Sequence, residues 1–244
     1  IIAVYDDIAD YILVKQGGKI NAVGTPDKPI VMTSEKEEPG AWGGIHICGR
    51  AHTNAEGGKG SSEIGGAVYG GNDDADNSGT LQYIRLEYTG FAFDEEHEAN
   101  GISFYGVGNG TIVDHCQAYK GSDDGFEFFG GSVNVSNLVA VSCSDDSFDW
   151  TEGWNGKGTN LVAYQEGKGQ PLTVETALTE NALKNGTSKL TNITLTSELS
   201  SKEGIYTHAD FIAVTSNKVD ANLSYSSFED IRKECSWMNG SWVK

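Results

Sequence analysis

The chain has 244 residues, among them 32 Gly and 4 Pro, and a formal net charge of −18. Glycine without a period of three excludes collagen, and 38% hydrophobic residues argue against disorder. The excess of carboxylates argues against nucleic acid or an anionic membrane as partners, because both attract Lys and Arg.

The N-terminal third predicts short strands joined by turns. Residues 20–32 predict strand, turn and strand, and residues 41–47 predict the next strand. Residues 49–80 are rich in Gly, Asn, Asp and Ser, so we expect a long loop that projects from the strands.

The middle of the chain repeats. Residues 99–104, 123–128 and 145–150 share an acidic or small turn followed by apolar, polar and apolar residues, at offsets of 24 and 22. Residues 116–118, 138–140 and 161–163 form a second series, at offsets of 22 and 23. Strands that recur at one coil length predict a parallel β-solenoid, whereas a sandwich would pair consecutive strands as hairpins.

Glycine fits this winding, because each coil needs sharp corners where glycine adopts positive φ freely. Gly101 and Gly125 are expected at one corner and Gly130 at the next. We therefore predict an all-β fold of one domain, residues 1–244, with less regular coils and a cap at about 168–244. A short helix is expected near 172–185, and apolar residues near the C-terminus are expected to cover the open end of the stack, namely Phe228, Ile231, Trp237 and Trp242.

Residues 12 to about 167 resemble a family of surface or outer-membrane lipoproteins of Gram-negative bacteria, often Bacteroidota. The matching motifs are Gly24-Thr25 with Pro29-Ile30, Trp42-Gly43-Gly44, Asn77-Ser78-Gly79-Thr80-Leu81, Gly108-Asn109-Gly110-Thr111, Ser122-Asp123-Asp124-Gly125-Phe126-Glu127-Phe128-Phe129-Gly130-Gly131 and Asp145-Asp146-Ser147-Phe148-Asp149. The resemblance implies a right-handed parallel β-helix of the pectate-lyase type. It also implies an extracytoplasmic protein, held at the outer membrane by an N-terminal lipid outside this chain, and no assigned reaction.

The acidic repeats are the strongest chemical signal. In a solenoid, stacked positions lie about 4.8 Å apart, so we expect three columns: Asn100, Asp124 and Asp146; Asp123 and Asp145; and Ser103, Glu127 and Asp149. Three interpretations remain open. The side chains serve turns of the backbone, or they bind Ca²⁺ through Asp124, Asp146 and Asp149, or they cleave glycosidic bonds. The catalytic candidates are Asp123, Asp124, Asp145, Asp146 and Glu127.

Catalysis has little further support in the sequence. Pectin hydrolases with this fold carry Gly-His-Gly and Arg-x-Lys motifs, which this chain lacks. A lyase needs an Arg or Lys base, and Arg85 and Lys120 are better explained as local partners of Glu87 and Asp123. The five scattered His and four widely spaced Cys predict neither a zinc site nor a disulfide framework.

Two further ligand sites are suggested. Asp74, Asp76 and Ser78 imitate the first half of a calcium loop, although Arg85 stands where the closing Glu belongs. Trp154 follows Glu152-Gly153 at a corner, where it either packs into the core or corner or is exposed as a platform for sugars, with Glu127 and Asp149 as neighbouring ligand-binding residues. Trp150 should instead point into the core.

The leading hypothesis is a non-catalytic cell-surface β-helix that binds a glycan or a surface protein. One alternative is a polysaccharide lyase or glycoside hydrolase that uses the stacked carboxylates. Another is a purely structural spacer.

Overall fold

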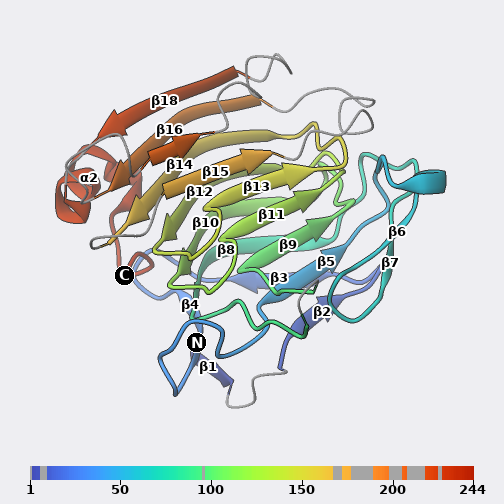
Figure 1. Cartoon of the computed structure of the whole chain (residues 1–244), viewed down its shortest axis with the longest axis horizontal. Helices are drawn as coiled ribbons and strands as arrows, with labels where there is room; N and C mark the ends of the chain where they lie inside the picture. The colour runs from blue at the N-terminus through green and yellow to red at the C-terminus, as the bar shows by residue number, and fades with distance from the viewer. Residues whose placement is uncertain are drawn as a thin grey trace.

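The computed structural model describes residues 2–5, 10–94, 97–166, 172–176, 189–197, 205–207, 218–224 and 227–244, and it is a parallel β-helix (Figure 1). Sheet A contains, in spatial order, β1 (Ile2–Tyr5), β4 (Ile30–Ser34), β8 (Gly79–Glu87), β10 (Ile112–Tyr119), β12 (Asn134–Val141), β14 (Lys157–Gln165), β16 (Lys189–Ser197) and β18 (Lys218–Ser224), with β3 (Ile20–Val23) also paired to β8. Sheet B contains β17 (Ile205–Thr207), β15 (Leu172–Thr176), β13 (Phe148–Thr151), β11 (Phe126–Phe129), β9 (Ile102–Tyr105), β5 (Ile45–Cys48) and β2 (Ile12–Val14).

The register confirms the coil lengths read from the sequence. Phe126 pairs with Ile102 on one side and with Phe148 on the other. In sheet A, Leu138 pairs with Cys116 and with Leu161. Both sheets are parallel throughout these pairs, so each coil stacks on the equivalent strands of the next.

The core is a stack of apolar side chains between the two sheets. The ring centroids of Phe126 and Phe148 lie 5.5 Å apart, and those of Phe104 and Phe128 lie 5.0 Å apart, each pair with nearly parallel rings. Trp150 is 3% exposed and belongs to this core, as predicted. Because inward and outward residues alternate along a strand, the residues between these aromatics face away from the core.

The corners of the coils depend on glycine for two different reasons. Gly130 has φ of +62°, which suits glycine as expected. Gly101 and Gly125 are not among the positive-φ residues. A Cβ on Gly101 would lie 2.3 Å from the carbonyl oxygen of Gly125, so close stacking of the coils, rather than φ, requires glycine there.

Residues 49–78, which we call the excursion, separate β5 from β8 and contain η1 (Glu56–Gly58), β6 (Gly60–Ser61) and β7 (Val68–Tyr69). Part of the excursion packs back on the outer face of sheet B, because Ala67 and Tyr69 contact Tyr105 and Phe129. Tyr69 Oη also donates to both carboxylate oxygens of Glu152, at 3.0 Å each. The long segment predicted to project is therefore tied to the stack.

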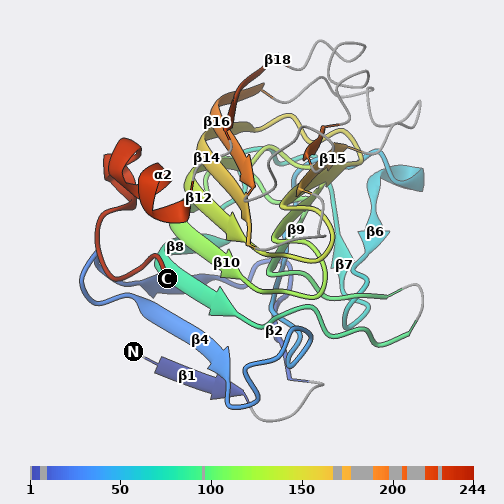
Figure 2. The ribbon, with the colours of Figure 1, turned by 60° about the vertical axis from the view of Figure 1, so that its left-hand side comes forward.

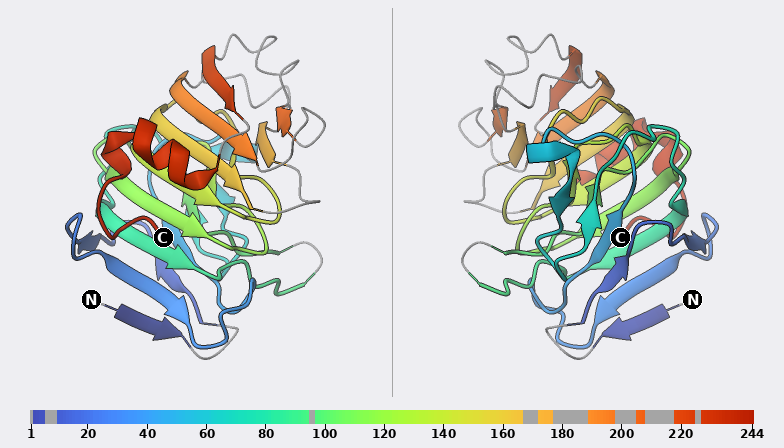
Figure 3. Two further views of the ribbon diagram at one scale, coloured as in Figure 1. Left: turned by 90° about the vertical axis from the view of Figure 1, so that its left-hand side faces the viewer. Right: turned by 90° about the vertical axis from the view of Figure 1, so that its right-hand side faces the viewer.

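Two expectations for the C-terminal part are wrong. Leu172–Thr176 is strand β15 rather than helix, because it adds to β13 in the coil register; residues 177–185 lie outside the described residues. The C-terminal strap, residues 227–244, covers the outer face of sheet A rather than the open end of the stack (Figures 2 and 3). It contains α2 (Phe228–Glu234) and η3 (Ser236–Met238).

The strap fits this face because several outward residues of sheet A beneath it are apolar. Val139, Val141 and Val162 pack with Ile231 and Trp242 of the strap. All four cysteines are free, as the sequence predicted. Within the described residues, no helix has the length and apolar character needed to cross a membrane.

Candidate cation-binding site

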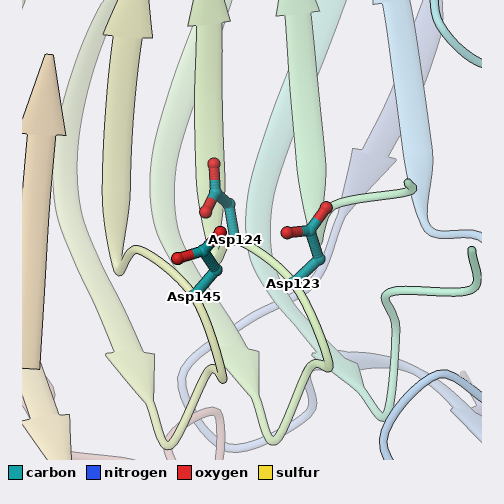
Figure 4. A group of neighbouring side chains, drawn as sticks. All are labelled: Asp123, Asp124 and Asp145. Carbon is teal, nitrogen blue, oxygen red and sulfur yellow. The ribbon is translucent and has the colours of Figure 1, made fainter. Parts of the chain in front are cut away.

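Five acidic side chains meet at the turns into β11 and β13 and on the outward positions of these strands. We call this group the carboxylate cluster: Asp123, Asp124, Glu127, Asp145 and Asp149. Oxygens of Asp123, Asp124 and Asp145 lie within 4.8 Å of one another (Figure 4), and so do oxygens of Asp124, Glu127 and Asp149. Asp124 belongs to both sets and joins them.

Stacking of equivalent positions brings the cluster together. Glu127 pairs with Ser103 on one side and with Asp149 on the other, which confirms that predicted column. Glu175 takes the next register position beside Asp149. At the preceding corner, the amide of Gly101 donates to the carbonyl oxygen of Asp124, so Asn100 and Asp124 also stack as expected.

Asp124 has a structural contact as well as a place in the cluster. Its Oδ1 accepts the backbone amide of Asp146 at 2.8 Å, the turn-stabilising role considered from the sequence. Asp146 itself is 4% exposed and belongs to neither set of clustered oxygens. The backbone amide of Asp146 faces Asp124, and Glu127 completes the second set of clustered oxygens; a ligand or catalytic role for the Asp146 side chain stays a prediction.

Burial and repulsion both destabilise the charged forms of the cluster. Burial, followed by the charges of Glu98 and Asp145, raises the pKa of Asp123 to about 7. Burial, followed by Glu127 and Asp149, raises the pKa of Asp124 well above its usual range. The pKa of Glu127 is also raised by burial and then by Asp149. The charged neighbours that act most strongly on all three groups are carboxylates.

Asn100 points into the cluster and is 1% exposed. Its Nδ2 donates to Glu127 Oε2 at 2.5 Å and to Ser103 Oγ at 3.0 Å. Its Oδ1 is buried and has no hydrogen-bond partner among the described residues. A buried amide oxygen without a donor is costly, so a cation or donor beside Glu127 would satisfy it.

Two acidic residues near the cluster were missed by the sequence analysis. Glu63, in the excursion, raises the pKa of Glu127 and has its own pKa raised by burial to about 7. Glu98 lies in an acidic segment that precedes β9, and its charge raises the pKa of Asp123. Neither residue belongs to the coil repeat, and no motif marks either one. The folding of inserted segments against sheet B brings them here.

In the acidic loop at residues 72–79, the side chains predicted to bind calcium contact groups of the protein itself, and the calcium site stays a prediction. Asp74 Oδ1 accepts from the His52 ring at 2.7 Å, and Asp76 Oδ2 accepts from Ser78 Oγ at 3.2 Å. Asn77 Oδ1 caps the amide of Gly79 at 2.9 Å. The oxygens therefore serve neighbouring donors and turns, and neither carboxylate belongs to a group of clustered acids among the described residues.

Two other predicted roles are corrected. Trp154 is 2% exposed and stacks on Phe128 at 4.4 Å, so it cannot offer a platform to a sugar. Its Nε1 donates to the carbonyl oxygen of Val133, which explains why the ring turns inward at its corner. Lys120 pairs with Glu166 at 3.1 Å instead of Asp123, whereas Arg85 pairs with Glu87 at 2.6 Å, as expected.

Comparison with known proteins decides the family. A family model described as a pectate-lyase-like beta helix domain matches residues 1–203. The chain belongs to this family. The match to the pectate-lyase-like β-helix family extends beyond the residues 12–167 that carried the resemblance in sequence. No curated protein and no solved structure matches the chain significantly.

Proposed function

We propose that the protein is a non-catalytic cell-surface β-helix that binds Ca²⁺ at the carboxylate cluster and uses this face to bind a glycan or a surface protein. One observation carries the proposal. Carboxylate oxygens from three side chains, Asp124, Glu127 and Asp149, gather within 4.8 Å, and the strongest charged neighbours of Asp124 and Glu127 are also acids. A bound cation would relieve both the repulsion and the cost of burial.

The donors suit Ca²⁺ better than a softer metal. Ca²⁺ takes six to eight hard oxygens in flexible geometry, and the three carboxylates supply up to six. The free Oδ1 of Asn100 adds one more oxygen of the same type. Zinc prefers nitrogen and sulfur ligands, and neither His nor Cys belongs to the clustered groups among the described residues.

The same site would also explain recognition of a glycan. Ca²⁺ held by protein oxygens on one side can accept sugar hydroxyl or carboxylate oxygens on the other. Asp123 and Asp149 are only partly buried and Asp145 is exposed, so the site is within reach of solvent. Membership of a pectate-lyase-like family supports a carbohydrate-related role without deciding between binding and cleavage.

Calorimetric titration with Ca²⁺ and thermal melting test the proposal. At 100 times Kd, a single site stabilises the protein by about 2.7 kcal/mol. In a chain of this size, this corresponds to a rise in Tm of roughly 5–10 °C, which EDTA should reverse. We expect Glu127→Gln to weaken Ca²⁺ binding at least tenfold, and Glu35→Gln, an exposed control with the same change of charge, to leave it unchanged.

An absence of heat and of any shift in Tm with Ca²⁺, Mg²⁺ and Mn²⁺ would leave the structural spacer as the better interpretation. Equal Ca²⁺ affinity of wild type and Glu127→Gln would instead move the cation site away from this cluster.

One observation favours glycoside hydrolysis as a second candidate. Asp123 has a pKa of about 7, which suits a general acid, and carboxyl oxygens lie within 4.8 Å of its own. A lyase is less well supported, because Arg85 and Lys120 both pair with other acids. If the protein is a hydrolase, a panel of uronate and neutral glycans should show release of reducing ends that Asp124→Asn abolishes.

Location at the bacterial surface, with a lipid tether outside this chain, is part of the proposal. It is supported by the resemblance of the repeat motifs to surface lipoproteins. Protease treatment of intact cells should remove the protein, while a periplasmic marker in the same cells stays intact.

A further inference from the structure

A second site lies at the N-terminal end of sheet B, away from the carboxylate cluster. A pocket of about 580 Å³ opens between the chain around β2 and the excursion. Its lining includes Tyr11, Leu13, Lys15, Gln16, Lys19 and Gly65. The pocket therefore combines an aromatic ring, two ammonium groups and an amide side chain within one hollow.

The aromatic part of this pocket is exposed. Tyr11 is 36% exposed and Phe93 is 40% exposed, and they are the exposed aromatic side chains in the part of the chain that the structure describes. Their ring centroids lie 5.9 Å apart, with an edge-to-face geometry. Tyr11 also contacts the buried ring of His46 at 6.0 Å, which supports it from behind. The exposed ring of Tyr11, held by these contacts, offers an apolar face to a ligand in the pocket.

The charge of the pocket is opposite to that of the protein. The chain carries 17 Lys and Arg against 35 Asp and Glu, yet Lys15 and Lys19 line the same hollow. Neither forms an ion pair within the described ranges, whereas Lys120, Lys233 and Lys244 each pair with an acid. Two lysines without a carboxylate partner are available to an anion from outside.

The turn that carries these lysines is held in place. Gln16 Nε2 donates to the carbonyl oxygens of Gly49 and Gly70, at 2.7 and 2.9 Å. Gly17 has φ of +81°, and a Cβ there would lie 2.6 Å from the guanidinium of Arg50. Arg50 therefore packs against the turn between the lysines and adds a third positive charge. A site that is built before the ligand arrives loses less entropy on binding.

We propose that this pocket binds an acidic sugar residue, with the ring of Tyr11 against an apolar face of the sugar and with Lys15 and Lys19 on its carboxylate or sulfate. Ligand pockets commonly combine aromatic walls with a few polar groups that fix orientation. The proposal names the glycan class for the glycan-binding part of the proposed function and does not depend on Ca²⁺.

The pocket and the carboxylate cluster lie along the same sheet. Strands β2, β5, β9 and β11 are consecutive neighbours in sheet B, so about 14 Å separates the first from the last at the usual spacing. The excursion packs over the strands between them, where His46, Ser103 and Tyr105 are fully buried, so the pocket is tested as a site of its own. Tetrasaccharides are large enough to fill it.

Calorimetry in EDTA with three tetrasaccharides tests the inference: hyaluronan, which carries carboxylates, carrageenan, which carries sulfates, and chitotetraose, which is neutral. We expect at least one acidic probe to bind and the neutral probe to bind at least tenfold more weakly. Lys15→Gln with Lys19→Gln should reduce acidic binding at least tenfold, as should Tyr11→Ala. The control pair Lys28→Gln and Lys36→Gln, exposed on the same acidic protein, should have no effect.

Three results would overturn the inference: no binding of either acidic probe at millimolar concentration, equal binding of the neutral probe, or unchanged binding in the pocket variants. Melting curves that match wild type establish that the variants are folded. Glu127→Gln separates the two proposals, since it should weaken Ca²⁺ binding at least tenfold and leave binding of the acidic probes in EDTA intact. If wild type binds the acidic probes but not Ca²⁺, the proposed cation site fails and this inference stands. If it binds Ca²⁺ but not the acidic probes, this inference fails and the cation site stands.

Discussion

Buried carboxylates have opposite charged neighbours on the two outer faces of the β-helix, cations on sheet A and other acids on sheet B. On sheet A, Glu87 is 4% exposed and contacts Arg85 at 2.6 Å and Lys244 at 3.0 Å. Burial alone would raise its pKa, but the hydrogen bonds from these two cations outweigh burial and lower it. On sheet B, Asp124 and Glu127 have acidic neighbours and raised pKa values.

This difference does not come from the repeat, because both sheets are built by the same coils. It comes from what covers each face. The C-terminal strap supplies Lys244 and an apolar cover to sheet A, whereas the excursion supplies another acid, Glu63, to sheet B. On sheet A, Glu87 is thus neutralised by cations of the chain itself, whereas for the acids of sheet B we have proposed a cation from outside.

The largest expected effect is on the covered face. Trp242 is fully buried against Tyr83 and His115, so Trp242→Ala should lower the free energy of unfolding by about 4 kcal/mol, as for other large buried side chains. Urea denaturation measures this loss. Phe93→Ala, at an exposed aromatic of the other face, should cost far less, and equal losses would contradict the assignment of sheet A as the sealed face.

The second effect depends on pH and concerns His46, which is buried on sheet B against Tyr11 and Tyr105. Burial lowers its pKa from 6.5 to about 4. Between these pH values the imidazole is therefore protonated in the unfolded chain and neutral in the folded chain. Stability from this group is present above pH 6.5 and is lost as pH falls toward 4, by up to about 3 kcal/mol. The loss should appear in urea denaturation at a series of pH values.

His46→Asn provides the comparison for this prediction. The carboxylate cluster contributes with the opposite sign, since groups with a raised pKa bind protons more readily when folded. The difference between wild type and variant isolates His46. Identical pH slopes for the two proteins would show that His46 titrates normally.

The third prediction compares one substitution on each face. Glu87→Gln leaves Arg85 and Lys244 without their carboxylate, and we expect a loss of about 2 kcal/mol in the free energy of unfolding, since breaking a buried ion pair is costly. Denaturation in EDTA and 0.15 M salt measures it. A rise in the free energy of unfolding would contradict this prediction and would mean that Glu87 destabilises the folded protein.

The smallest expected effect has the opposite sign. Glu127→Gln removes a charge that burial and Asp149 disfavour, so in EDTA it should stabilise the protein by about 1 kcal/mol, the equivalent of somewhat less than one pKa unit. In saturating Ca²⁺ the same variant should be less stable than wild type. A destabilisation in EDTA similar to that of Glu87→Gln would remove the contrast between the faces.

Much of the fold was predictable because the offset between successive repeats equals the number of residues in one coil. The spacing of Asn100, Asp124 and Asp146 fixed one column, and that of Ser103, Glu127 and Asp149 fixed another. Spacing cannot tell which group of a stacked residue faces its neighbour: Asp146 presents its backbone amide to Asp124, and the ligand role of its side chain stays a prediction. The strap was recognised as a cover, but its apolar pattern is equally suited to a sheet face and to an open end.

The residues that complete the site could not be predicted, because they lie outside the repeat. Glu63 and Glu98 belong to segments with no counterpart in other coils, and only their folding against sheet B brings them near Asp123. The pocket could not be predicted for the same reason, because Gly65 of the excursion lies outside the repeat and lines the pocket together with Tyr11.

The C-terminal strap also affects the order in which the molecule can be completed. The amide of Ser241 donates to the carbonyl oxygen of Pro26 at 2.8 Å, and the amide of Lys244 donates to Gln117 at 2.8 Å. Repeat proteins normally contact only neighbouring coils and can unravel from one end. Here the early coils acquire their last partners only after the final coils have been synthesised. Fraying at the early coils is then coupled to release of a segment more than 200 residues away.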